Sequence, residues 1–134
     1  MAGRRKPRWL SRIVIDAIHT EQVREHGGLA GIRDENALES ALARPQQKWN
    51  YDPKVDIAAL AAAYGFGLAR NHAYRDGNKR IAFLAVYTFL GLNDWDFRAS
   101  EADVIAEVLA LASGQITEEQ LGDWIRQHIA RIRS

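Results

Sequence analysis

One nine-residue stretch, His72 to Arg80, gathers side chains whose types and spacing could do chemistry together. It reads HAYRDGNKR: an imidazole, a carboxylate four residues later, a Gly-Asn pair and two adjacent cations. Imidazole takes up and releases protons near neutral pH, and one carboxylate with phosphate oxygens and water is the usual way to hold Mg²⁺. The stretch therefore predicts activation of a hydroxyl group and its attack on a Mg²⁺-bound nucleotide phosphate. Each part also has an ordinary role, since Asp-Gly-Asn is common in turns and Lys-Arg is a common solvated helix start.

Two apolar segments flank this stretch and must position it. Residues 57–71, capped by Asp56, are rich in alanine, and residues 81–92 are apolar on every side, so both are predicted to be buried central helices. The polar stretch would then be a loop held at the edge of the core, ending at the N-terminus of the second helix. Lys79 and Arg80 would oppose the helix dipole there by some tenths of a kcal/mol each, and a bound polyphosphate would offset this.

The composition is that of an ordinary water-soluble domain. With 134 residues, no cysteine and an apolar run of at most twelve residues, the chain predicts one domain without disulfides, zinc-thiolate sites or a bilayer-spanning helix. We expect residues 1–8 to be a basic, disordered tail, residues 9–134 to be the domain, and the location to be cytoplasmic. The net charge of +1 less the four basic residues of the tail leaves a slightly acidic body, which argues against nucleic-acid binding by the folded surface.

The rest of the chain predicts more helices and no long strand, hence an all-α bundle of about six helices. The first helix would span residues 9–25, with Leu10, Ile13 and Val14 inward and His19 isolated on the surface. Pro45 would end the second helix, which Asp34 caps, and make residues 44–55 a loop or weak hairpin in which Trp49 and Tyr51 could align a target. The last two helices would follow Ser100 and Thr117, and the final one would reach about Arg133.

HAYRDGNKR resembles the pattern of the Fic/Doc family, roughly His-x-Phe-x-Asp/Glu-Gly/Ala-Asn-Gly/Lys-Arg between two central helices, with Tyr74 in place of the usual Phe. The stretch from His26 to Gln46, HGGLAGIRDENALESALARPQ, is similar to the early part of Doc, the death-on-curing toxin branch. The resemblance covers the chain from about residue 9 to the end. It implies Mg²⁺ and ATP, or another nucleoside triphosphate, as cofactors. By residue, it implies His72 as general base, Asp76 as Mg²⁺ ligand, and a phosphate site made by Arg70, Gly77, Asn78, Lys79 and Arg80.

Two departures from the Fic branch bear on the reaction. AMP-transferring members have glycine where Lys79 stands and a second arginine where Phe83 stands. The resemblance to Doc therefore implies transfer of the γ-phosphate to a hydroxyl side chain, with elongation factor Tu as the implied target. Gly77, where Doc itself has alanine, keeps the alternative of AMP or other nucleotidyl transfer open.

The resemblance also implies a partner. Fic proteins are often silenced by a Ser/Thr-x-x-x-Glu-Gly/Asn helix, and this sequence contains no such string. That suits a toxin restrained by a separate, Phd-like antitoxin whose tail folds into a groove. A third hypothesis belongs to a different class: a non-catalytic module that binds an antitoxin or nucleic acid through the loop and the basic tail.

Overall fold

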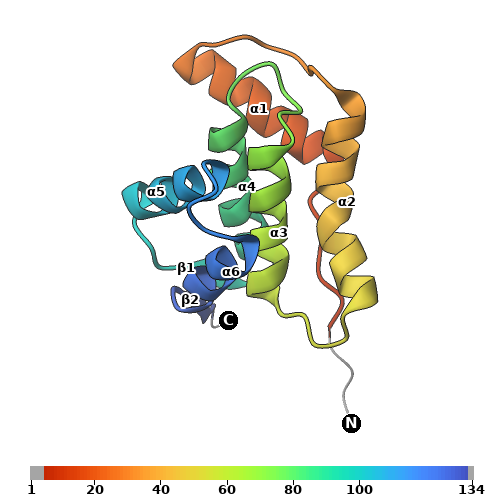
Figure 1. Ribbon diagram of the computed structural model, residues 1–134, viewed down its shortest axis with the longest axis vertical. Helices are drawn as coiled ribbons and strands as arrows, with labels where there is room; N and C mark the ends of the chain where they lie inside the picture. The colour runs from red at the N-terminus through yellow and green to blue at the C-terminus, as the bar shows by residue number, and fades with distance from the viewer. Residues whose placement is uncertain (1–4, 133–134) are drawn as a thin grey trace.

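Two helices, α3 (Ile57–Arg70) and α4 (Asn78–Leu92), occupy the centre of the protein and are joined by a short loop (Figure 1). The computed structural model describes residues 5–132, and most side chains of α3 and α4 are buried. The other elements described are α1 (Arg12–His26), α2 (Glu35–Tyr51), β1 (Trp95–Phe97), α5 (Glu101–Ala112), α6 (Glu118–Arg126) and β2 (Ile129–Arg131). The prediction of an all-α bundle of about six helices around two central ones is confirmed.

Small residues let α3 approach its neighbours closely. A methyl group added at Gly67 would lie 3.0 Å from the Cα of Ala41 on α2. On another side of α3, a methyl group at Gly65 would meet Val86 of α4 at 3.2 Å and Leu121 of α6 at 3.3 Å. The alanine- and glycine-rich sequence of α3 therefore allows three other helices to pack directly against its backbone.

Side-chain caps fix where most of the helices begin. Asp34, Asp56 and Ser100 each accept a hydrogen bond from the backbone N–H three residues later, as predicted. Thr117 forms a full capping box with Gln120 at the start of α6. The carboxylate of Asp56 also accepts hydrogen bonds from Arg126 on α6, which lower the pKa of Asp56.

Helix α2 continues through Pro45 to Tyr51, so the prediction of a loop or hairpin over residues 44–55 is wrong. Proline removes one backbone hydrogen bond, but its ring is buried here. The second half of α2 is tied to α6 by Glu118, which is only 4% exposed and pairs with both Arg44 and Lys48. These long-range contacts outweigh the local preference of proline for ending a helix.

Helix α1 turns a different face inward from the one predicted. Its buried residues are Ile15 and His19, one turn apart, whereas Ile13 is 82% exposed and Val14 is 39% exposed. Leu10 is buried but precedes the helix, and its N–H donates to the hydroxyl of Tyr64 at 3.0 Å. The predicted inner face is wrong because the helix begins after Leu10, and His19 is buried and does not lie on the surface.

The C-terminal part also differs from the prediction, because α6 ends at Arg126 and the chain then forms β2. Strand β2 pairs antiparallel with β1, and Phe97 lies opposite Ile129. The guanidinium of Arg131 stacks over Trp95, 5.1 Å from the ring centroid. A strand of three residues is too short to show the alternation typical of strands. The apolar residues at Ile125, Ile129 and Ile132 have helical spacing, and the sequence therefore predicted a longer helix.

The chain before α1 lies against the far end of α4. The N–H of Arg8 donates to the Oδ1 of Asn93 at 2.7 Å, and its carbonyl accepts from the same side chain at 3.0 Å. Residues 1–4 of the predicted tail lie outside the described residues. Within residues 5–132, no helix combines the length and the hydropathy needed to cross a membrane.

Candidate active site

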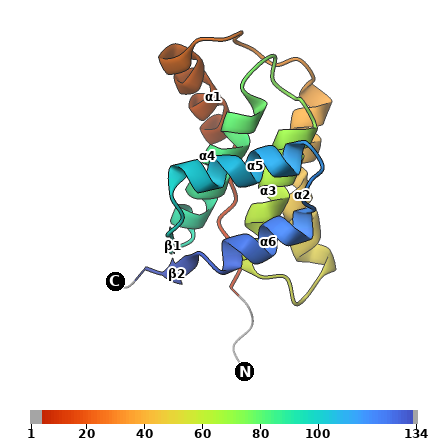
Figure 2. The ribbon, with the colours of Figure 1, turned by 60° about the vertical axis from the view of Figure 1, so that its left-hand side comes forward.

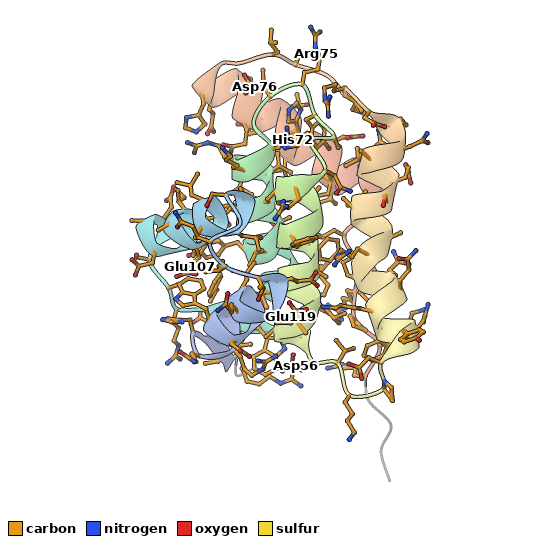
Figure 3. All side chains as sticks on the ribbon, in the orientation of Figure 1. Asp56, His72, Arg75, Asp76, Glu107 and Glu119 are labelled. Carbon is orange, nitrogen blue, oxygen red and sulfur yellow. The ribbon has the colours of Figure 1, made fainter. Side chains whose placement is uncertain are left out.

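The loop between α3 and α4 forms one side of an open pocket of about 510 Å³. Helix α5, which crosses the two central helices (Figure 2), supplies the other side. Figure 3 shows His72, Arg75 and Asp76 projecting from this loop. The pocket is lined by Ala69, His72, Arg75, Asp76, Gly77, Asn78, Lys79, Arg80, Phe83, Ile105, Val108 and Leu109. The structure thus brings six of the seven residues predicted for catalysis, metal and phosphate binding to one cavity.

His72 is an exposed residue directly after the end of α3, with a φ of 51°. This left-handed conformation is uncommon for a residue other than glycine and costs about 1–2 kcal/mol. The carbonyl of His72 accepts a hydrogen bond from Nε of Arg33 at 2.9 Å. No described residue hydrogen-bonds its imidazole, so the ring is available to a substrate in the pocket.

Asp76 is held through both its side chain and its backbone. Its carboxylate accepts from the N–H of Gly77 at 2.9 Å and from the N–H of Leu29 at 3.4 Å. Its carbonyl lies 3.0 Å from Nε2 of His19, which must carry the proton because a carbonyl can only accept. Asp76 forms no ion pair with the residues that the structure describes, so its carboxylate is available to bind a cation.

The N-terminus of α4 faces the same pocket. Gly77 precedes the helix in the left-handed conformation, with φ 77°, and no side chain among residues 5–132 caps the first N–H groups. Lys79 and Arg80 add two positive charges in this first turn. The open N–H groups, the helix dipole and the two cations together favour a multiply charged anion such as a polyphosphate.

Tyr74 and Asn78 make the loop rigid. The Asn78 side chain accepts from the N–H of Tyr74 and donates to its carbonyl, both at 3.0 Å, so it closes the loop and does not cap the helix. The buried Tyr74 ring stacks on His19, with centroids 3.9 Å apart, and its hydroxyl donates to Asp16 at 2.9 Å. Burial and this bond to a carboxylate raise the pKa of Tyr74, so the hydroxyl remains a donor.

An apolar wall stands opposite the charged loop. Phe83 of α4 and three residues of α5, Ile105, Val108 and Leu109, supply it. Phe83 is 5% exposed and packs edge-on against Tyr87, with ring centroids 5.2 Å apart. A cavity with one cationic side and one apolar side suits a ligand that carries phosphates on a flat, weakly polar group.

Three predicted residues do not join this pocket. Arg70 points over Phe66, 5.5 Å from the ring centroid, and is not among the lining residues. Trp49 and Tyr51 lie in the last turns of α2, whose first residues are the ones beside the loop (Figure 1). Trp49 packs edge-on against Trp9, and Tyr51 is 92% exposed. The loop predicted over residues 44–55 is therefore mostly helix, since α2 continues to Tyr51 and only residues 52–55 form a turn.

Sequence reasoning missed His19, Gly28 and Arg33, which all contact the loop from the N-terminal part of the chain. The sequence feature that could have indicated a buried His19 is its position four residues after Ile15, on the same face of α1. Gly28 and Arg33 lie in the linker between α1 and α2, where no periodic pattern marks their contacts with Asp76 and His72.

Asp76 is the residue that fits a metal ion here. No group of three or more His, Asp or Glu side chains that could hold a metal occurs within residues 5–132. An ion held by protein ligands alone is therefore not supported by the described residues. One carboxylate that forms no ion pair with the described residues and lies beside an anion site does fit Mg²⁺, which takes most of its ligands from phosphates and water.

Replacing Gly28 with alanine is expected to weaken metal binding about tenfold or more, as losses of supporting contacts at metal sites usually do. A methyl group there would lie 2.8 Å from Oδ2 of Asp76, so the carboxylate would have to move. The measurement is Mn²⁺ binding by electron paramagnetic resonance in the presence of ATP. Gly27→Ala is the control, since Gly27 also has a positive φ of 78°, but beyond its chain neighbours no described atom lies within 4 Å of an added methyl group. Equal weakening in both variants would show that backbone strain, not contact with Asp76, is responsible.

Comparison with known proteins agrees with this geometry. The family model described as the Fic/DOC family matches residues 9–90, which include the loop and the helices on both sides of it. The chain is 28% identical over 112 residues to a protein named Protein kinase doc from Escherichia phage P1, covering 83% of this chain and 87% of that protein. It is 42% identical over 89 residues to a protein named Toxin Doc from Mycolicibacterium smegmatis, covering 61% of this chain and 68% of that protein. The chain belongs to the Fic/DOC family, and Doc proteins are among its relatives.

Proposed function

We propose that this protein is a Doc-type toxin that transfers the γ-phosphoryl group of Mg²⁺-ATP to a hydroxyl side chain of a target protein. The observation that carries the proposal is one pocket in which His72 and Asp76 stand beside the cationic N-terminus of α4. Membership of the family and the names of its two relatives support a nucleotide-dependent transferase and a toxin. Following the resemblance to Doc, elongation factor Tu is the proposed target.

The described side chains suit each part of the reaction. The free imidazole of His72 takes the proton of the target hydroxyl, whose oxygen attacks the γ-phosphorus. The bond from that phosphorus to the β–γ bridging oxygen breaks, and ADP leaves with the bonding electrons. The N–H groups at the start of α4, with Lys79 and Arg80, stabilise charge on the transferred group. When bound, Mg²⁺ would neutralise phosphate charge, and Asp76 would hold it.

Nucleotidyl transfer is the alternative, and Gly77 is the residue that favours it by resemblance to the Fic branch. The structure supplies another reason for this glycine, since its φ of 77° lies in the left-handed region that glycine adopts at no steric cost. Gly77 therefore does not discriminate between the two reactions. Lys79 in the pocket and Phe83 in its wall, where AMP-transferring members have glycine and arginine, support phosphoryl transfer.

Incubation with ATP labelled on either phosphate distinguishes the two reactions. We expect label from γ-labelled ATP to appear on purified elongation factor Tu, and no label from α-labelled ATP. Label from α-labelled ATP alone would establish nucleotidyl transfer instead. If neither label is transferred to the factor or to any lysate protein, the third hypothesis of a non-catalytic binding module replaces both.

A Phd-like antitoxin is the proposed partner. The name Toxin Doc of one relative supports a toxin whose activity must be restrained by a second protein. Co-expression with the candidate antitoxin should restore growth of cells that produce this chain. The antitoxin should be dispensable for a His72→Ala variant, because that variant lacks the activity to be restrained.

A further inference from the structure

The linker between α1 and α2 runs alongside the loop that carries His72 and Asp76. In Figure 1 it passes over the α3–α4 loop at the top of the molecule. The N–H of Arg75 donates to Gly31 at 3.1 Å, and Ile32 and Tyr74 form an antiparallel bridge. Next in order, the carbonyl of Ala73 accepts from the N–H groups of both Arg33 and Asp34, at 2.8 and 3.0 Å. Together these bonds fix the loop from Ala73 to Arg75 through the backbone.

His72 is the next residue in this series, and a side chain rather than the backbone reaches it. Its carbonyl accepts from Nε of Arg33 at 2.9 Å. On the other side of His72, Asn71 donates its side-chain amide to the carbonyl of Ala37 at 3.1 Å. The left-handed backbone of His72 is therefore bounded by fixed neighbours on both sides.

The position of His72 at the end of α3 explains why such a tether is needed. It directly follows the C-cap residue Asn71, a position usually taken by glycine in the left-handed conformation. In the common helix endings, backbone N–H groups bond back to the last turn and stabilise that conformation. Neither His72 nor Ala73 donates such a bond to α3 within residues 5–132. Contacts with the linker must therefore offset the unfavourable φ of 51°.

We propose that Arg33 is a positioning residue that holds His72 in its left-handed conformation and so aims the imidazole into the pocket. This rests on the proposed role of His72 as the base. Arg33 forms no ion pair with the described residues, so its hydrogen bond to His72, rather than its charge, is the relevant contact. A right-handed backbone at His72 would continue α3 and carry the ring away from Asp76 and the start of α4.

Two substitutions separate the hydrogen bond from the charge. Glutamine places an N–H donor at the same number of bonds from Cα as Nε of arginine, whereas methionine fills similar space with no donor. We expect Arg33→Met to lower kcat about tenfold, with little change in the KM for ATP, because the base is misplaced and the phosphate site is intact. Arg33→Gln should recover most of this loss. Arg24→Met, at an exposed arginine paired with Glu21, is the surface control and should leave kcat unchanged.

A readout that does not need activity is the ¹³Cβ chemical shift of His72, which reports the backbone conformation. It should move in Arg33→Met towards the right-handed value and stay near the wild-type value in Arg33→Gln. Unchanged kcat and unchanged shift in Arg33→Met would overturn the proposal for Arg33. If the chemical shift moves in Arg33→Met but the wild-type protein itself transfers no phosphoryl group, Arg33 is still a tether of His72 and the proposed function is refuted.

Discussion

Replacing His72 with glycine is expected to abolish transfer and, in the same protein, to stabilise the fold. Loss of a general base lowers the rate by about two to four orders of magnitude. Glycine accepts the φ of 51° without the steric cost that histidine carries, although it loses more entropy on folding. We expect a net gain in the free energy of unfolding of up to about 1 kcal/mol, measured by urea denaturation.

His72→Ala is the matched control for this prediction. Alanine also removes the imidazole, so transfer should fall equally, but its Cβ retains the steric cost and stability should not rise. A gain in stability with both variants would mean that the imidazole itself, and not the backbone conformation, destabilises the fold. Retention of transfer in both would remove His72 from the mechanism.

Replacing Gly67 with alanine is expected to destabilise the protein by about 1–3 kcal/mol, the usual cost of overpacking a core. The added methyl group would lie 3.0 Å from the Cα, 3.1 Å from the Cβ and 3.3 Å from the carbonyl oxygen of Ala41. These are mostly backbone atoms, so relief requires α2 and α3 to separate. Thermal and urea denaturation give the change in the free energy of unfolding.

Gly91→Ala near the end of α4 is the corresponding control. Apart from neighbouring atoms of α4 itself, no atom of the described residues lies within 4 Å of a methyl group added at Gly91, so alanine brings only its better helix propensity, worth at most about 1 kcal/mol. We expect a small gain in stability there, opposite in sign to the change at Gly67. Destabilisation of similar size at both positions would show that close packing of α2 on α3 is not what requires Gly67.

The sequence was most informative where short stretches determine their own structure. Four helix starts depend on a local hydrogen bond between a side chain and a nearby N–H group. The predicted caps are Asp34, Asp56, Ser100 and Thr117, and all four are confirmed. The loop residues were predictable as a group because they are adjacent in sequence. Two flanking apolar helices then leave them little freedom.

Long-range contacts account for the errors. Pro45 does not end α2, because the ion pairs of Glu118 with Arg44 and Lys48 hold the next turns in place from seventy residues away. The last residues form β2 because β1 offers a partner.

The residues that support the loop were also not predicted, because their contacts with it are long-range. His19 contacts Asp76, Arg33 contacts His72, and Gly28 lies against the carboxylate of Asp76. Of these three residues, only His19 has a periodic sign in the sequence, its spacing of four residues from the buried Ile15. The chemistry of the loop could therefore be predicted, whereas the residues that orient it could be found only in the structure.

The mass added to a modified target protein tests the proposed reaction most directly. Purified elongation factor Tu is incubated with Mg²⁺-ATP and either the wild-type protein or His72→Ala, and its peptides are analysed by mass spectrometry. We predict that one hydroxyl-bearing residue gains the mass of a phosphoryl group with the wild-type protein and gains nothing with the variant. Addition of an adenosine monophosphate to that residue, or phosphorylation that persists with His72→Ala, would contradict phosphoryl transfer by this loop.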